Sequence, residues 1–263
     1  MNNFINRVYG NYLMPSRLQH YEELLRRGID AGYRQTSIRA FFRSMADADF
    51  SERKVIVHRH DVDSDIRTAR KIFAIEKKNG VHSTFYFRLS TLDFPFMREI
   101  NDYGSEASYH YEEIATFAKK NNIRSAAQIN ARLSDIRRDF RHNFDYIQER
   151  LSYKLSTVAS HGDFVNRQLA IPNTEVLNDG ELRRHCGIEC ESYDRALLEK
   201  FDIYITDRPH PEYFHPISPI NAIDFHKKIC ILTHPMQWET NWLENTRSNS
   251  IRFYEGLLWK LLR

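Results

Sequence analysis

The sequence predicts an α/β fold built on a mostly parallel, buried sheet of the kind that closes into a barrel. Short apolar runs alternate with amphipathic segments, and continuous apolar strands are typical of parallel sheets that helices cover. Several of these runs end in a histidine or an aspartate, which is where such folds place catalytic groups. The length of 263 residues and the hydrophobic content of 41% suffice for one sizeable core.

Charge and composition exclude several functions. The 38 basic and 35 acidic residues give a net charge of +3, whereas nucleic-acid binding needs clustered cationic charge. No apolar run reaches the roughly 20 residues of a transmembrane helix, and the N-terminus lacks the apolar core of a secretory signal. The 3 cysteines are an odd number and make no disulfide framework. We therefore expect a cytoplasmic protein without a nucleic-acid partner and without a transmembrane segment.

The first motif-bearing strand is preceded by segments without candidate site residues. Residues 15–30 and 35–47 have helical patterns, and we expect them to pack outside the main sheet. No repeat, low-complexity tract or flexible linker interrupts the chain, so a single domain over residues 1–263 is expected.

An apolar strand over residues 55–60 leads into the acidic turn Asp61-Val62-Asp63, and a helix follows over 64–79. Side chains alternate along an extended segment, so Asp61 and Asp63 lie on the same side of it. One carboxylate can bind a metal while the other serves as a base. The alternative is an aspartate that caps the helix, followed by a solvated turn.

The next strands repeat this arrangement. A strand over 83–88 and a short helix over 96–103 precede a strand over 106–109, which ends at His110. A helix is expected over 111–120.

A long helix and three further strands follow. Apolar residues recur at spacings of three and four from Ile129 to Leu151, which predicts a helix packed on the sheet rather than a coiled coil. The remaining strands cover residues 157–161, 203–207 and 229–234, and they end in His161, Asp207 and His234.

These polar strand ends are expected to form one site, because the carboxyl ends of parallel strands meet at one rim. A carboxylate and two imidazoles make a three-ligand metal site that leaves room for water and substrate. Zinc is the first choice for such ligands, with nickel, cobalt or iron as alternatives. A spare carboxylate and a histidine would then serve as general base and general acid. The alternative for each single histidine is a structural, hydrogen-bonded imidazole.

The motifs resemble those of the polysaccharide deacetylases of the NodB-homology type, carbohydrate esterase family 4, in the divergent branch found in O-antigen gene clusters. The resemblance covers roughly residues 53–240 and rests on five segments: Arg59-His60-Asp61-Val62-Asp63, the helix from Ile66 to Gly80 with the strand Ser83-Thr84-Phe85-Tyr86-Phe87, Glu106 with His110-Tyr111-Glu112, Ala159-Ser160-His161-Gly162-Asp163, and Leu232-Thr233-His234-Pro235-x-Gln237-Trp238. It implies a distorted parallel (β/α)7-type barrel with extra N- and C-terminal helices. It also implies metal-dependent removal of an N- or O-acetyl group from a sugar of a surface-polysaccharide precursor.

The resemblance also implies roles for single residues. Asp61 would be the general base, His234 the general acid, and Asp63 and His110 metal ligands. The family's usual second histidine of this motif is replaced by Ile114, so one ligand is missing.

We assign His161 as the replacement ligand, with Glu113 as the weaker alternative. Trp238, Arg167 and Asp207 are expected on the substrate side of the site: Trp238 as a wall of the sugar pocket, Arg167 as a substitute for an absent motif arginine, and Asp207 as a supporting residue.

Two other functions remain open at this point. A related hydrolase could act on cyclic amides, because a fold does not fix its substrate. A degenerate barrel could also bind carbohydrate without catalysis. The oligomeric state, the metal and the sugar are not indicated by the sequence.

Overall fold

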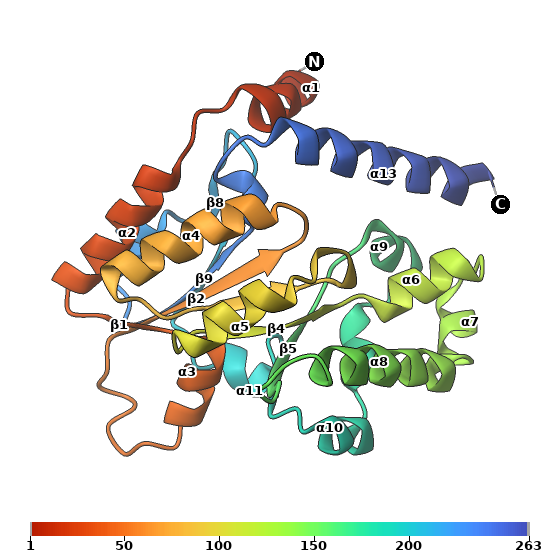
Figure 1. Cartoon of the computed structure of the whole chain (residues 1–263), viewed down its shortest axis with the longest axis horizontal. Helices are drawn as coiled ribbons and strands as arrows, with labels where there is room; N and C mark the ends of the chain where they lie inside the picture. The colour runs from red at the N-terminus through yellow and green to blue at the C-terminus, as the bar shows by residue number, and fades with distance from the viewer. Residues whose placement is uncertain (1, 262–263) are drawn as a thin grey trace.

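The computed structural model describes residues 2–261, and its centre is a curled, mostly parallel sheet (Figure 1). Seven parallel strands follow one another across this sheet in the order β6, β5, β4, β3, β2, β9 and β7. Their bounds are Cys190–Glu191, Thr157–Ser160, Glu106–Tyr111, Thr84–Phe87, Val55–Val62, Lys228–Thr233 and Ile203–Asp207. The predicted α/β class with a mostly parallel sheet is confirmed.

Two further strands complete the sheet. β8 (Phe214–His215) pairs antiparallel with β7, and β1 (Arg34–Thr36) pairs parallel with the first half of β2. Among the described residues no pairing joins β6 to β7 or β8, so the barrel is distorted and open at this seam.

Helices surround the sheet, and most begin directly after a strand. The helices that follow the strands of the first half are α4 (Ile66–Asn79), α5 (Phe94–Asp102), α6 (Glu113–Lys120), α7 (Ala126–Asn130) and α8 (Leu133–Gln148). Those of the second half are α9 (Phe164–Leu169), α10 (Gly180–Cys186), α11 (Arg195–Leu198) and α12 (Pro219–Ile223). The short helical turns are η1 (Tyr9–Leu13), η2 (Leu89–Thr91), η3 (Asn173–Leu177) and η4 (Pro235–Gln237).

Local sequence explains why the central strand and its helix meet at the site. Every residue of β2 is buried, with neighbouring strands on both sides. The Asp65 side chain accepts a hydrogen bond from the Thr68 amide and caps α4, which ends at Gly80 in the left-handed region (φ 67°). The turn between strand and helix therefore holds Asp61 and Asp63 at the carboxyl end of β2.

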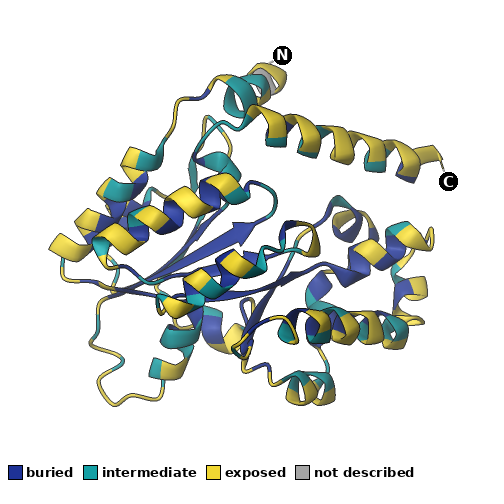
Figure 2. Ribbon diagram, in the orientation of Figure 1, coloured by how far each residue is buried: buried dark blue, intermediate teal, exposed yellow. Residues whose placement is uncertain are grey.

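The terminal helices lie outside the sheet, as predicted. α1 (Asn2–Val8), α2 (Leu18–Asp30) and α3 (Ile38–Ser44) precede β2, and α13 (Trp242–Leu261) ends the described chain. Figure 2 shows that the strands are buried, whereas much of α13 is exposed. No helix within residues 2–261 combines the length and the apolarity that a membrane crossing requires.

Three expected elements differ from the structure. Residues 35 and 36 of the expected helix 35–47 belong to β1 instead, because their main chain pairs with Ile56 and Val57. The long helix over 129–151 is two helices, α7 and α8, with a break at Ala131 and Arg132, although its apolar stripe stays buried. The strand at 106–109 continues to Tyr111 and so includes His110.

The expected single domain stays a prediction. Its residues 1, 262 and 263 lie outside the described part of the chain.

Candidate metal centre and catalytic site

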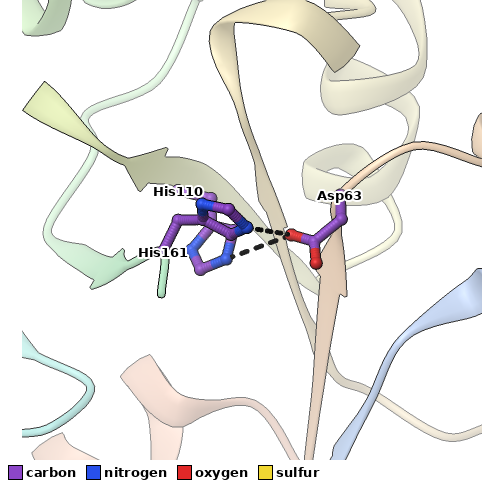
Figure 3. Close-up of side chains that lie close together, drawn as sticks. All are labelled: Asp63, His110 and His161. Carbon is purple, nitrogen blue, oxygen red and sulfur yellow. Dashed lines mark ion pairs between the residues drawn. The ribbon is translucent and has the colours of Figure 1, made fainter. Parts of the chain in front are cut away.

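Three candidate ligands meet at the carboxyl ends of neighbouring strands. Asp63 follows β2, His110 lies in β4, and His161 directly follows β5. Asp63 Oδ1 is 3.4 Å from His110 Nε2 and 3.6 Å from His161 Nε2. Figure 3 shows both imidazole rings pointing at this carboxylate from one side.

The three side chains fit a small divalent metal. Tetrahedral zinc with bond lengths of about 2.0–2.1 Å requires ligand atoms that lie roughly 3.3–3.4 Å apart. The observed separations are close to this value, and one ligand atom from each residue lies within 4.8 Å of the others. Asp63 Oδ1 is buried and has no hydrogen-bond partner among the described residues, as expected for an atom that a metal would satisfy.

Each histidine has its second ring nitrogen close to an oxygen acceptor. His110 Nδ1–H donates to the Ala159 carbonyl at 3.0 Å, so Nε2 keeps a lone pair that faces Asp63. His161 Nδ1 lies 3.3 Å from Glu112 Oε2, which likewise leaves Nε2 for the site. Contacts of this kind orient imidazole ligands and raise their basicity.

Arg88 holds Glu112 in place. Its Nε and Nη2 donate to the two oxygens of Glu112 at 3.1 and 2.6 Å. Burial alone would raise the pKa of Glu112, but His161 and Arg88 lower it to about 2, so the carboxylate stays ionised. Sequence reasoning missed this role, because nothing in the sequence shows that Glu112, directly after β4, would reach a residue after β5.

Without a metal, the site retains a proton on His161. Burial opposes this charge, but the carboxylates of Asp63 and Glu112 raise the pKa of His161 to about 9. Burial also works against the Asp63 charge, yet both histidines hold its pKa well below the usual range. A metal ion would compete with this proton for the His161 imidazole, so metal binding would release it.

The proposed base, Asp61, lies beside the ligands and is held by an arginine. Arg59 Nε and Nη2 each donate to one Asp61 oxygen at 2.8 Å, and His110 Nε2 is 3.4 Å from Asp61 Oδ2. Burial would raise the pKa of Asp61, but the Arg59 guanidinium, together with the neighbouring His110 ring, outweighs burial and lowers it. Sequence reasoning missed Arg59, although the two-residue period that pairs Asp61 with Asp63 also places Arg59 on the same side.

The proposed acid, His234, directly follows β9, which neighbours β2 on the side away from His110 and His161. β2 and β9 pair with His60 opposite Thr233, so Asp61 and His234 each come one residue after this pair. His234 Nδ1–H donates to Asp207 Oδ1 at 2.6 Å, which leaves Nε2 for a substrate. Burial would lower the pKa of His234, but Asp207 raises it to about 9. The side chain is 25% exposed, so a protonated imidazole is accessible at neutral pH.

Two of the expected substrate-binding residues lie beneath the site instead of lining it. The Trp238 side chain belongs to the core and is 1% exposed, so it cannot wall a sugar pocket. Its indole N–H donates to Asp207 Oδ2 at 3.1 Å. Asp207 is also inaccessible, because both of its oxygens are used by His234 and Trp238. Its position is that of a support for His234.

The weaker alternatives have other surroundings. Glu113 accepts hydrogen bonds from Tyr109 and Asn143 and lies outside the ligand cluster. Ile114 is fully buried in the main core. Arg167 is exposed beside a cavity next to His161, so its contact with substrate stays a prediction; the arginine that pairs with Asp61 is Arg59.

Two cavities open on either side of His161. One of about 540 Å³ extends from Asp63 and His161 to α13. The other, of about 500 Å³, is lined by residues from Ser160 to Thr174 and by Tyr193. A substrate that reaches the ligand cluster therefore has room to extend in two directions.

Comparison with solved structures finds proteins of the family that the motifs resemble. A CE4 family pseudoenzyme from Bacillus anthracis matches with a TM-score of 0.41 and 14% identity, over 75% of this chain and 60% of its own. The candidate polysaccharide deacetylase WbmS of Bordetella bronchiseptica, involved in O-antigen biosynthesis, matches with a TM-score of 0.41 and 12% identity, over 89% and 93% of the two chains. The peptidoglycan deacetylase PdaC of Bacillus subtilis matches with a TM-score of 0.32 and 13% identity, over 78% and 97%.

The chain thus spans about three fifths of the B. anthracis protein that it matches. No family model and no curated protein sequence matches it.

Proposed function

We propose that the protein is a metal-dependent hydrolase that removes an N- or O-acetyl group from a sugar of a surface-polysaccharide precursor. The observation that carries this proposal is the convergence of three side chains that could bind a metal, Asp63, His110 and His161, between the Asp61 carboxylate and His234. The O-antigen setting of WbmS supports the choice of substrate.

One divalent metal would be held by Asp63, His110 and His161, with zinc as the first choice and nickel, cobalt or iron as alternatives. Such a metal polarises an acyl carbonyl and lowers the pKa of water towards about 7.

The chain's own residues would supply the proton transfers. Asp61 is ionised and held by Arg59, so it can accept the proton of the attacking water. His234 is protonated at neutral pH and can donate from Nε2 to the departing amine or hydroxyl. Asp207 orients His234 and stabilises its charge.

Acetate release tests the proposal directly. The purified protein, with zinc and with the alternative metals, is incubated with a panel of N- and O-acetylated sugars, and its metal content is measured in parallel. We expect release by the wild type and loss of near-stoichiometric metal in His161→Ala. His185→Ala is the matched control, because His185 is an exposed histidine of α10.

Each result decides between specific alternatives. Full retention of metal by His161→Ala would refute the assignment of the third ligand. No release from any acetylated sugar by the metal-loaded wild type would refute the deacetylase and favour a carbohydrate-binding protein. Release of ammonia or ring opening of cyclic amides instead would favour the related C–N hydrolase.

A further inference from the structure

The larger cavity beside the ligand cluster continues as a groove beneath the C-terminal helix. Its inner end is lined by Asp63 and His161, and its outer end by α6 and the inward side of α13. The lining residues of α13 run from Glu244 to Trp259 at spacings of three and four, so they form one face of this helix. Trp259 anchors this face, since its indole N–H donates to Gln168 and its ring packs on Phe164.

Ion pairs within the groove use up most of its carboxylates. Lys119 bridges Asp163 and Glu255 at 3.1 and 3.0 Å, and thereby ties α6 to both α9 and α13. Glu112 is paired with Arg88 at the inner end. These acidic side chains therefore offer little negative charge that would repel an anionic ligand.

Two cations at the outer end are not used in this way. Lys120 of α6 and Arg252 of α13 are exposed, line the groove and form no ion pair with any residue between 2 and 261. Arg247 is 69% exposed at the side chain, and its one ion pair among residues 2–261 is a long contact of 3.8 Å with Glu244. The Arg124 guanidinium also lies at this end, with its carbon 3.5 Å from the centre of the Trp259 ring.

We propose that the outer end of this groove binds an anionic group of the substrate, a phosphate or a diphosphate, while the acetylated sugar lies at the ligand cluster. Arginine and lysine side chains recognise phosphate oxygens through charge-assisted hydrogen bonds. A sugar joined to a diphosphate carries this charge beside the ring, whereas a finished neutral glycan carries none. The inference rests on the proposed function and narrows its substrate class to sugar phosphates, linked either to a nucleoside or to a lipid.

Binding measurements on the full chain test the inference. The zinc-loaded protein is titrated with UDP-N-acetylglucosamine and with the uncharged N,N′-diacetylchitobiose, and the two dissociation constants are compared. Lys120→Ala/Arg252→Ala should weaken nucleotide-sugar binding by about tenfold for each cation removed and leave binding of the uncharged sugar unchanged. Arg195→Ala/Lys200→Ala is the matched control, because it removes two exposed cations of and next to α11.

Two further measurements separate binding by the cations from binding by the metal, and a nucleoside carrier from a lipid carrier. Diphosphates also bind metals, so titration of the metal-free protein with UDP must show the same dependence on Lys120 and Arg252. A polyprenyl diphosphate sugar in detergent is compared with the nucleotide sugar: tighter binding of one identifies the carrier, and both must depend on the two cations.

The inference is overturned if the wild type binds charged and uncharged sugars equally, or if the double variant binds the nucleotide sugar as tightly as the wild type does. Failure of the proposed function would look different: neither sugar would release acetate, although the charge-dependent binding would persist.

Discussion

Glu112→Gln should weaken metal binding without removing any metal ligand. In the wild type the Glu112 carboxylate lies 3.3 Å from His161 Nδ1, and the two side chains are only 11% and 12% exposed, so solvent screens their attraction weakly. An amide of the same shape keeps a hydrogen-bond acceptor but loses the negative charge. Loss of such a carboxylate behind a histidine ligand typically costs 10–100-fold in metal affinity, or about 1.4–2.8 kcal/mol.

The effect should depend on pH in a defined direction. Glu112 and Asp63 together raise the pKa of His161 to about 9, so at pH 7 the metal must displace a proton that Glu112 also stabilises. At pH 7 the Glu112 carboxylate therefore stabilises both the metal ion and the competing proton, so its removal lowers the metal affinity by less. At pH 9 about half of the His161 population is neutral, and the loss of metal affinity should be larger.

Competition with a chromophoric chelator at pH 7 and pH 9 measures the zinc dissociation constants. Glu113→Gln is the matched control: Glu113 is the next residue and is also buried, but it bonds to Tyr109 and Asn143 instead of a ligand. Unchanged affinity of Glu112→Gln at pH 9, or an equal loss in Glu113→Gln, would refute the reasoning. Urea unfolding of the metal-free variants shows whether either substitution acts through stability alone.

Three other predictions concern the acid, the base and the core. Asp61→Asn should retain metal but lower turnover by about 10²–10⁴-fold; near-normal acetate release at full occupancy would contradict the mechanism. Activity of the metal-loaded protein should fall as pH rises through about 9, because His234 must be protonated to donate. The acidic limb of the pH–activity profile should lie below the usual aspartate range, since the pKa of Asp61 is lowered. Asp207→Asn should move the basic limb to lower pH, because Asp207 raises the pKa of His234. An unshifted limb would show that Asp207 does not control His234. Trp238→Ala should lower the free energy of unfolding by about 3–5 kcal/mol, and a loss below about 1 kcal/mol in urea titration would argue against its place in the core.

The grouping of the candidate ligands was predictable, because the order of strands in the sequence also indicates where the strand ends lie in the fold. Asp63, His110 and His161 each follow or end an apolar strand, and the carboxyl ends of parallel strands share one rim. That geometry follows from the order of elements alone, without any knowledge of side-chain contacts.

The errors come from information that local patterns do not contain. Trp238 is close in sequence to His234, but its burial depends on how the chain after β9 packs against Asp207 of β7. The same limit applies to β1, where pairing with β2 overrides a helical pattern. Arg59 is different: its spacing from Asp61 is visible in the sequence, but the buried ion pair between the two side chains is not.

The proposed assignment of His161, in place of a ligand at position 114 of α6, changes what a bound metal would do to the protein as a whole. Two histidines four residues apart would attach the metal to a single stretch of chain, whereas the donors proposed here come directly after β2, within β4 and directly after β5. The ion would then cross-link the chain segments at the ends of β2, β4 and β5, and β3 lies between β2 and β4 in the sheet. Since the unfolded chain cannot present this arrangement, metal binding favours the folded state by mass action. Resistance of the purified protein to proteolysis should therefore increase when the metal is bound, and a cell short of metal would degrade the protein faster.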